Sequence, residues 1–292
     1  MEAATAADFD IRFQATPHDA IYSIAAEGDK MLAVGALGMA VASQDGGKSW
    51  TREDTPTTLA LLGVAINKGR VLAVGQGGTI LRKDSAGWQK IDGGNDGRLM
   101  AVAMDTDGLA VIVGGFGTIL RSEDGGATWQ TVAMDWMALL KDAQEPHLYS
   151  VRMVGKSVFV TGEFGLVLKS TDRGKTWSAT TTGDASLFDV VFDDHGGGLA
   201  VGQKGTIVKT VDGGATWQQV PSPSDATILG VWRNGNKAEA VGIQCAFKSI
   251  DGGATWTADN RGDTSTGWYE AVIGGAQPII VGHTGRVVIL GD

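Results

Sequence analysis

Short runs of hydrophobic residues recur along this chain and indicate β-strands. In one stretch of the sequence the runs are Leu187–Phe192, Gly198–Val201, Thr206–Lys209 and Trp217–Val220. Each run is short, is alternating or β-branched, and is bounded by Gly, Asp or Pro. This pattern predicts four consecutive antiparallel strands joined by tight turns.

The same pattern repeats along nearly the whole chain. A Val-Gly or Thr-Gly pair marks each repeat, with its glycine at positions 35, 75, 114, 162, 202, 242 and 282. Successive glycines are 39 or 40 residues apart, except that Gly114 and Gly162 are 48 residues apart. Repeats of about 40 residues with four strands each are typical of the blades of a β-propeller.

The number of repeats predicts a single all-β domain, a seven-bladed β-propeller with four-stranded antiparallel blades. The seventh repeat has only three strands, between Trp268 and Leu290, whereas Phe9–Gln14 stands alone before the first repeat. We expect this N-terminal strand to complete the last blade and close the ring, which leaves fewer open sheet edges. The blades are expected at residues 16–54, 55–92, 93–134, 135–182, 183–221, 222–260 and 261–292, the last one joined by strand 9–14.

A second motif, Ser/Thr-x-Asp-x-Gly-x-Ser/Thr-Trp, follows the marker glycine in five repeats, and the second repeat has a shortened version, Lys83–Trp88. Ser and Asp side chains bond nearby backbone N–H groups, and glycine supplies the positive φ of a hairpin turn. The Trp then begins the next strand and buries a large ring. We therefore interpret these residues as structural. The Asp and Trp residues of the motif are Asp45, Trp50, Asp124, Trp129, Asp172, Trp177, Asp212, Trp217, Asp251 and Trp256.

This motif is the Asp-box, or BNR, repeat. Combined with Val113–Ile119 and Ala200–Ile207, it resembles the photosystem II stability/assembly factor family and its bacterial relatives, from about Ile21 to Leu290. The resemblance implies a non-catalytic scaffold that binds membrane-associated or exported proteins during assembly, in a lumenal or periplasmic space. Sialidases, sortilin-like receptors and some glucanases share the motif. The alternative is therefore a carbohydrate-active propeller, either a sialidase-like glycosidase or a lectin.

Candidate partner-binding residues come from loops that share one face of a propeller. These are the loops between the second and third strands and the connections between blades, where side chains vary on a repeated backbone frame. Such variation is typical of a binding surface and also of unconstrained loops. The candidates are Gln76, Phe116, His147, Glu163, Phe164, Gln203, Lys204, Gln244, Trp268 and His283.

The long third interval contains an insertion, Met134–Gln144, with apolar residues at positions 136, 137, 139 and 140. This spacing fits a short amphipathic helix. Trp136 is either buried against the rim of the ring or part of a lip that contacts a partner, and we add it to the candidates.

The first strand of each repeat carries a column of small residues that suits the wall of a central channel. Two carboxylates interrupt this column and could hold a cation or ordered water in the channel, although two carboxylates alone are weak support for a metal. The column is Ser23, Gly63, Ala101, Ser150, Asp189, Gly230 and Glu270. A second column, which we interpret as packing, is Tyr22, Leu62, Met100, Tyr149, Phe188, Leu229 and Tyr269.

A basic column precedes the Asp motif at Arg82, Arg121, Lys169, Lys209 and Lys248. One interpretation is a basic arc for an acidic partner. The interpretation we favour is that the long aliphatic stems pack between blades.

Composition narrows the function classes. The formal net charge of −9 disfavours binding to nucleic acid, and the absence of a long apolar run argues against membrane insertion.

Cys245, the single cysteine, cannot form an intramolecular disulfide, and we expect it to be buried and inert. A sialidase needs an arginine trio and a Tyr/Glu pair, and only Tyr269-Glu270 juxtaposes the latter types. We expect no catalytic residues, no cofactor, no metal and a monomer.

The N-terminal segment Met1–Asp8 has neither the basic nor the apolar region of a signal peptide. We expect it to be the start left after signal cleavage, with an added methionine. This expectation places the protein in the periplasm or elsewhere outside the cytoplasm.

Overall fold

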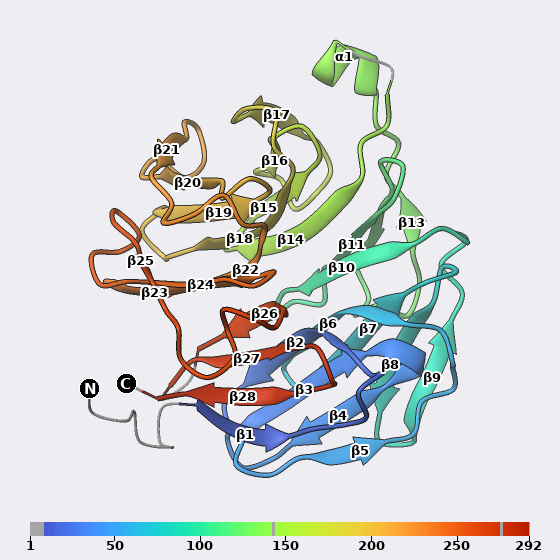
Figure 1. Cartoon of the computed structure of the whole chain (residues 1–292). Coiled ribbons are helices and arrows are strands. Elements are labelled where there is room, and N and C mark those ends of the chain that lie inside the picture. Colours follow the sequence, from blue (N-terminus) through green and yellow to red (C-terminus); the bar gives the residue numbers. More distant parts are fainter. Residues whose placement is uncertain (1–8, 142–143, 275–276, 292) are drawn as a thin grey trace, which may run out of the picture.

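The computed structural model describes residues 9–141, 144–274 and 277–291. Across these residues the chain forms seven four-stranded antiparallel sheets, arranged as blades round a ring (Figure 1). The predicted seven-bladed β-propeller is therefore confirmed.

The strands follow the same order in every blade, from the inner edge to the outer edge. Blade 1 has β2 (Ile21–Glu27), β3 (Lys30–Gly35), β4 (Ala40–Ser43) and β5 (Thr51–Glu53); blade 2 has β6 (Leu61–Asn67), β7 (Arg70–Gly75), β8 (Ile80–Asp84) and β9 (Gly87–Ile91). Blade 3 has β10 (Leu99–Met104), β11 (Ala110–Gly114), β12 (Ile119–Ser122) and β13 (Gln130–Thr131); blade 4 has β14 (Leu148–Val154), β15 (Ser157–Gly162), β16 (Leu166–Ser170) and β17 (Ser178–Thr181). Blade 5 has β18 (Leu187–Phe192), β19 (Gly198–Gly202), β20 (Ile207–Thr210) and β21 (Gln218–Val220); blade 6 has β22 (Ile228–Asn234), β23 (Lys237–Gly242), β24 (Ala246–Ser249) and β25 (Thr257–Ala258). Blade 7 has β26 (Tyr269–Ile273), β27 (Ile279–Gly282), β28 (Val287–Leu290) and β1 (Phe9–Phe13), and the helical elements are η1 (Ala36–Gly38) and α1 (Trp136–Leu140).

The N-terminal strand completes the last blade. β1 pairs antiparallel with β28, so that Phe9 lies opposite Leu290, and the sheet order is β1-β28-β27-β26. The Phe9 ring also meets Tyr269 edge to face at 6.4 Å between centroids. The predicted closure of the ring by residues 9–14 is confirmed, and Figure 1 shows the blue β1 beside the red β28.

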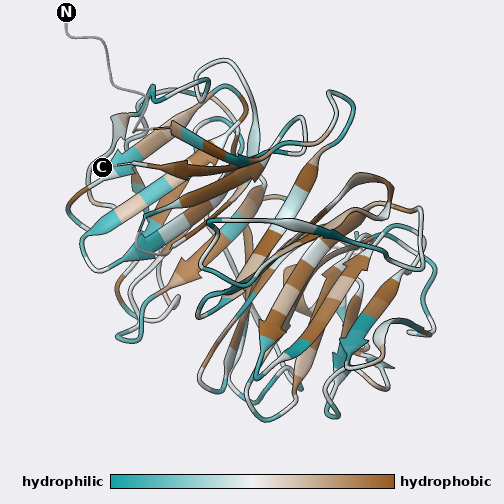
Figure 2. Cartoon of the chain, turned by 90° about the horizontal axis from the view of Figure 1, so that it is seen from below, coloured by the Kyte–Doolittle hydropathy of each residue, from teal (hydrophilic) through white to brown (hydrophobic). Residues whose placement is uncertain are grey.

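The hydrophobic core lies between blades. The inner strands of successive blades contact one another round the ring, and β26 returns to β2. Each hydrophobic cluster combines residues of two adjacent blades, as where Trp129 of blade 3 joins Ile80 of blade 2. Figure 2 shows the brown, apolar strands that supply these contacts and the teal and white loops at their ends. Because every blade buries both faces against neighbours, no blade has a complete core of its own.

The Ser/Thr-x-Asp turns join the third and fourth strands. In blade 3, Ser122 Oγ donates to Asp124 Oδ1 at 2.7 Å, and the N–H of Gly126 donates to Ser122 Oγ at 2.9 Å. The N–H and Oγ1 of Thr128 donate to Asp124 at 2.9 and 2.7 Å. Burial alone would raise the pKa of Asp124, but these bonds outweigh it and lower the pKa to about 2. The side-chain polar groups of the turn therefore form their hydrogen bonds within the turn itself.

Two residues of the basic column join adjacent blades. Arg121 Nε donates to the carbonyl of Arg173 at 2.8 Å, and Lys169 Nζ donates to the carbonyl of Gly213 at 2.7 Å. In both pairs the acceptor lies in the Ser/Thr-x-Asp turn of the next blade. These two contacts agree with the packing interpretation of the column rather than with a basic arc.

The marker glycines mark a close approach of two backbone segments. A Cβ on Gly35 would lie 1.9 Å from the carbonyl oxygen of Ala20, so only glycine fits. The next residue, Ala36, donates its N–H to that carbonyl at 2.8 Å. The same bond recurs in every blade and ties the end of the second strand to the connection that enters the blade.

The structure corrects the alignment of blade 7. Tyr269 pairs with Gly282, as the fully buried Ile21 pairs with Gly35 in blade 1. Each inner strand then has one bulged residue, Tyr22 in blade 1 and Glu270 in blade 7. Glu270 therefore does not belong to the small-residue column, which Ala271 completes, and Tyr269 does not share a position with Tyr22. The sequence alignment had matched tyrosine to tyrosine, whereas the register is set by the marker glycine.

Candidate functional site

The loops between the second and third strands lie together on one face of the ring, which we call the loop face. The Ser/Thr-x-Asp turns lie at the opposite ends of the third strands, on what we call the turn face. Two exposed hydrophobic side chains on the turn face are Val211 and Ile250.

Each loop on the loop face carries a residue in the left-handed backbone conformation. Its φ lies between 50° and 60°, a region that glycine or asparagine adopts most readily. Blade 2 has glycine there, but the other blades have larger side chains. The seven residues are Leu37, Gly77, Phe116, Phe164, Lys204, Gln244 and Thr284.

Three of these strained positions present large hydrophobic side chains to solvent. Leu37, Phe116 and Phe164 are 69%, 73% and 53% exposed. A bulky residue at positive φ costs roughly 1–2 kcal/mol, and a side chain that is more than half exposed recovers only part of that by burial. The chain therefore retains side chains at these positions that do not stabilise the free protein.

Phe116, His147 and Glu163 form one group across blades 3 and 4. The N–H of Phe116 donates to His147 Nδ1 at 3.2 Å, and the two rings meet edge to face at 4.7 Å between centroids. The N–H of His147 donates to Glu163 Oε2 at 2.8 Å. Burial, and then Glu163, raise the pKa of the neighbouring Tyr149. These contacts hold the Phe116 loop in place beneath its exposed ring.

The insertion forms the expected helix, α1, beside this group. Its N-terminal cap is Asp135, which accepts a bond from the N–H of Ala138 at 2.9 Å. Trp136 is buried and packs over Gly117, where its indole leaves no room for a Cβ. Met137, by contrast, is 55% exposed. The structure thus places Trp136 in the core and leaves Met137 as a large exposed hydrophobic residue of the helix.

Trp268 and His283 form a second group, in blade 7. Trp268 stacks on Tyr22 with 6.3 Å between ring centroids, and His283 lies beside Trp268 and Tyr269. His283 Nε2 is 3.3 Å from Asp263 Oδ2. Burial lowers the pKa of His283, although Asp263 opposes the shift. Both candidates are partly buried, and they contribute little exposed surface.

The remaining candidates are spread round the ring. Gln203 and Lys204 of blade 5 and Gln244 of blade 6 are exposed, whereas Gln76 helps to line the central cavity. The structure therefore brings together Phe116, His147 and Glu163, with Phe164 next to Glu163 in the same loop, but it does not gather all the candidates into one site.

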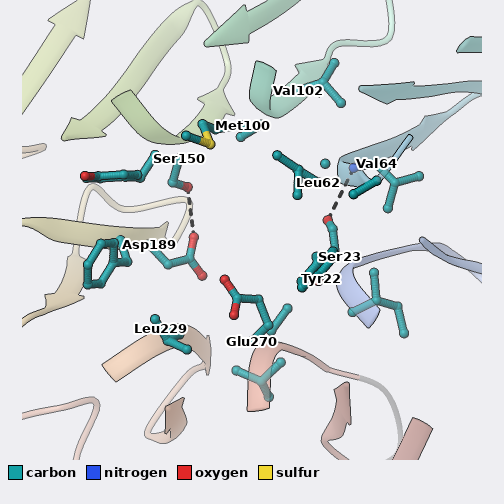
Figure 3. A pocket seen from close by; sticks show the side chains of 18 of the residues that line it. Tyr22, Ser23, Leu62, Val64, Met100, Val102, Ser150, Asp189, Leu229 and Glu270 are labelled. Atoms are coloured by element: carbon teal, nitrogen blue, oxygen red, sulfur yellow. Dashed lines mark hydrogen bonds between the residues drawn. The ribbon is translucent and has the colours of Figure 1, made fainter. Parts of the chain in front are cut away.

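A cavity of about 480 Å³ lies on the axis of the ring. The bulged residues of the inner strands form a collar that lines it, and Figure 3 labels five of them, Tyr22, Leu62, Met100, Leu229 and Glu270. The collar consists of Tyr22, Leu62, Met100, Tyr149, Phe188, Leu229 and Glu270. Six of these residues match the column interpreted as packing, because apolar residues that line a cavity and apolar residues that pack in a core have the same pattern in a sequence.

Asp189 lies in the same cavity and is held by three donors. Ser150 Oγ donates at 2.9 Å, Arg152 Nη2 at 3.0 Å and the N–H of Val231 at 3.1 Å. Figure 3 shows the carboxylates of Asp189 and Glu270 facing each other across the channel. Burial, and then Asp189, raise the pKa of Glu270 to about 7. The sequence reasoning placed both carboxylates in the channel but missed Arg152, which no repeat pattern marks.

The Tyr269-Glu270 pair does not have the geometry of a sialidase nucleophile. Tyr269 is fully buried, and its hydroxyl donates to Asp263 Oδ1 at 2.6 Å. Burial and Asp263 raise the pKa of Tyr269 well above its ordinary value. Cys245 is also buried, and burial raises the pKa of its thiol to about 11. In the residues the structure describes, no group of three or more His, Cys, Asp or Glu is placed to hold a metal, and no helix could span a membrane.

Comparison with known proteins gives a match to one family model. Residues 80–183 match the family model described as photosynthesis system II assembly factor YCF48. The resemblance to photosystem II assembly factors is confirmed. The matched segment includes Phe116, α1, His147 and Phe164. A comparison with curated protein sequences found no match.

Solved structures share the fold. The structure of YCF48 bound to D1 peptide superposes with a TM-score of 0.77 and 17% identity over 100% of both chains. YCF48 from Cyanidioschyzon merolae superposes with a TM-score of 0.79 and 18% identity, covering 98% of this chain and 99% of that one. The WD40 propeller domain of Doa1 reaches a TM-score of 0.75 at 11% identity and covers 97% of each chain. Because these identities are low, the superpositions establish the fold alone.

Proposed function

We propose that the chain is a non-catalytic scaffold that binds a protein during assembly of a membrane or exported protein complex. It binds this partner through the loop face of blades 3 and 4. The observation that carries the proposal is that Phe116 and Phe164 are bulky, exposed and held at positive φ. Residues that cost stability in the free protein are typical of functional surfaces.

The size and position of this surface support a protein partner. Phe116, Phe164 and Met137 are exposed apolar residues from adjacent segments of blades 3 and 4. Exposed aromatic and Met side chains are enriched in protein interfaces and provide most of the binding energy when a partner covers them. The Phe116 loop is preorganised by His147, so little conformational entropy is lost on binding.

The comparisons support the same class of function. The segment that matches the assembly-factor family contains the proposed surface, and a structural neighbour has been solved with a D1 peptide bound. For the present chain, we extend this to a protein partner that is membrane-associated or exported.

Site-specific photocrosslinking tests the proposal. A photoreactive phenylalanine analogue is placed at Phe116 or Phe164 in the host cell, and at Val211 on the turn face as the control. We expect positions 116 and 164 to give the same crosslinked protein and position 211 to give none, because Val211 is 78% exposed but faces away from the partner. Crosslinks from all three positions, or from Val211 alone, contradict the proposal.

We also propose that the protein acts in the periplasm or elsewhere outside the cytoplasm, as a monomer. The resemblance to assembly factors supports the location. Fractionation of cells that carry a tagged chromosomal copy tests it, with a cytoplasmic and a periplasmic marker followed in parallel. Recovery with the cytoplasmic marker contradicts this location without affecting the proposed binding surface.

A further inference from the structure

The cavity on the ring axis is lined by apolar and polar side chains, among them the carboxylates of Asp189 and Glu270. Six collar residues are apolar or aromatic, and the seventh position, in blade 7, is Glu270. Ala60, Gln76 and Arg98, which lie near the loop-face ends of their blades, also line the cavity. The cavity therefore reaches towards the face that carries the proposed protein-binding surface.

Glu270 differs from the other carboxylate in the cavity because it has no partner there. Asp189 accepts bonds from Ser150, Arg152 and the backbone of Val231. In the described part of the chain, no donor bonds to the Glu270 carboxylate, which faces the carboxylate of Asp189 across the cavity (Figure 3). A charged carboxylate that is partly withdrawn from water and faces another carboxylate is unfavourable unless a cation lies beside it.

We propose that the cavity binds an ammonium or guanidinium group carried on an aliphatic stem, with Glu270 as its acceptor. This is a lysine or arginine side chain of the protein partner, inserted through the loop face. The assignment to a partner side chain rests on the proposed function, whereas the affinity of the cavity for such a group does not.

The collar matches both parts of such a side chain. The methylene stem would pack against Leu62, Met100 and Leu229, and the charged head would meet the carboxylate beside aromatic faces such as Tyr22 and Phe188. A cavity of about 480 Å³ has room for one long side chain.

The other charges near the cavity leave Glu270 as the free acceptor. Arg152 is paired with Asp189 at 3.0 Å, and Arg98 belongs to blade 3, three blades round the ring from blade 7. The Glu270 carboxylate, which has no hydrogen-bond donor among the described residues and lies among apolar collar residues, therefore favours an aliphatic chain that ends in one cationic group. It disfavours an inorganic cation, which requires several oxygen ligands.

Titration of the free protein with small amines tests the cavity. The probe is butylammonium, compared with 1-butanol and MgCl₂, and the readout is the methyl NMR signal of Met100, assigned with Met100→Leu. We expect a saturable shift with butylammonium and at least about tenfold weaker binding by Glu270→Gln, because a charge-assisted hydrogen bond is lost. Asp184→Asn, which removes an exposed carboxylate outside the cavity lining, should leave the affinity unchanged.

Three outcomes overturn this part of the proposal. They are equal binding of butanol and butylammonium, unchanged affinity in Glu270→Gln, and a saturable shift with Mg²⁺ that requires Glu270. None of them affects the crosslinking test of the loop face, so failure here is distinguishable from failure of the proposed function.

A peptide comparison tests whether the group comes from a protein. Acetyl-Gly-Lys-Gly-amide and acetyl-Gly-norleucine-Gly-amide differ by the ammonium group. We expect the lysine peptide to shift the Met100 signal in the wild-type protein and in Asp184→Asn, and the norleucine peptide to bind at least about tenfold more weakly. If butylammonium binds and the lysine peptide does not, the site takes free amines and the assignment to a partner side chain is wrong.

Discussion

At the scale of single residues, this protein keeps several side chains that its own fold does not favour. Phe116 and Phe164 occupy positive φ while exposed, and Glu270 occupies a collar position that is apolar elsewhere in the ring. By contrast, the Asp124 carboxylate is fully used by its own turn. Side chains that cost stability and are not compensated within the chain are those we assign to binding.

Replacement of Phe164 by glycine should separate stability from binding. Phe164→Gly relieves the positive φ, and we expect the free energy of unfolding to rise by up to about 1 kcal/mol. The gain is limited because glycine also increases the entropy of the unfolded chain. Urea denaturation measures the change, and partner crosslinking from position 116 should weaken in the same variant. Val211→Gly, at a position where φ is not positive, serves as the control and should not stabilise the protein. A clear destabilisation by Phe164→Gly would contradict the prediction, because it would show that the Phe164 side chain packs against the free protein.

Replacement of Glu270 should change how stability depends on pH. The pKa of Glu270 is raised from 4.5 to about 7, so between these values the unfolded chain loses its proton while the folded chain keeps it. Stability therefore falls as pH rises through this window, by up to about 3 kcal/mol. Glu270→Gln should match the wild type near pH 4.5 and exceed it at pH 8, as measured by urea denaturation. A difference that is the same at both pH values contradicts the raised pKa, and Asp184→Asn provides the comparison for lost surface charge.

At the scale of elements, each blade depends on its neighbours, and the ring depends on β1. The inter-blade clusters mean that a blade buries its apolar residues against the blades on either side. β1 supplies the outer edge of the last blade, and Arg286 Nε donates to Gln14 Oε1 just beyond the strand. This N-terminal segment is therefore part of the last blade rather than a free terminus.

Deletion of residues 1–15 should destabilise the whole ring. Loss of the partly buried Phe9 and Phe13 and of the β1–β28 pairing should cost about 3–5 kcal/mol and lower Tm by roughly 10 °C. Deletion of residues 1–8, which lie outside the described residues, is the matched control. Thermal unfolding measures both, and an unchanged Tm in the longer deletion would show that β1 does not close the ring.

At the scale of the whole molecule, the ring separates two faces with different chemistry. The turn face carries carboxylates bonded within their own turns, with pKa values lowered in Asp45, Asp124, Asp172, Asp212 and Asp251. The loop face carries strained and exposed side chains and the mouth of the cavity. A partner bound at the loop face therefore meets the variable loops, while the turns maintain the blades.

The wild-type protein should be most stable near pH 5. The lowered pKa values of the turn aspartates add stability above about pH 4 that is lost as the pH falls through them. Glu239 and Glu270 have pKa values raised to about 7, so stability falls as pH rises from about 4.5 to 7. The lowered pKa of His283 makes stability rise with pH up to about 6.5, but this single group opposes the two glutamates Glu239 and Glu270. Tm measured from pH 3 to 9 tests this profile, and a maximum above pH 7 contradicts it.

Much of the fold could be predicted from the sequence, but less of the site. The strands, the blades and the role of Phe9–Gln14 follow from local patterns. The register of blade 7 was wrong because Tyr269 was matched to Tyr22 by residue type, although pairing with Gly282 decides it. The positive φ of Phe116 could not be predicted because the sequence Phe-Gly does not favour that conformation at phenylalanine. The group of Phe116, His147 and Glu163 depends on two blades meeting.

By itself, the sequence determined how many blades there are, where their hairpins turn and how the ring is closed. These features depend on strand periodicity and turn chemistry, which act over a few residues and recur every 40 or so. Only the tertiary structure decided that Glu270 faces Asp189, that Trp136 is buried, and that Phe116 and Phe164 are exposed. Those outcomes depend on how the closed ring brings together residues that are far apart in the sequence, and no local pattern in the chain specifies these contacts.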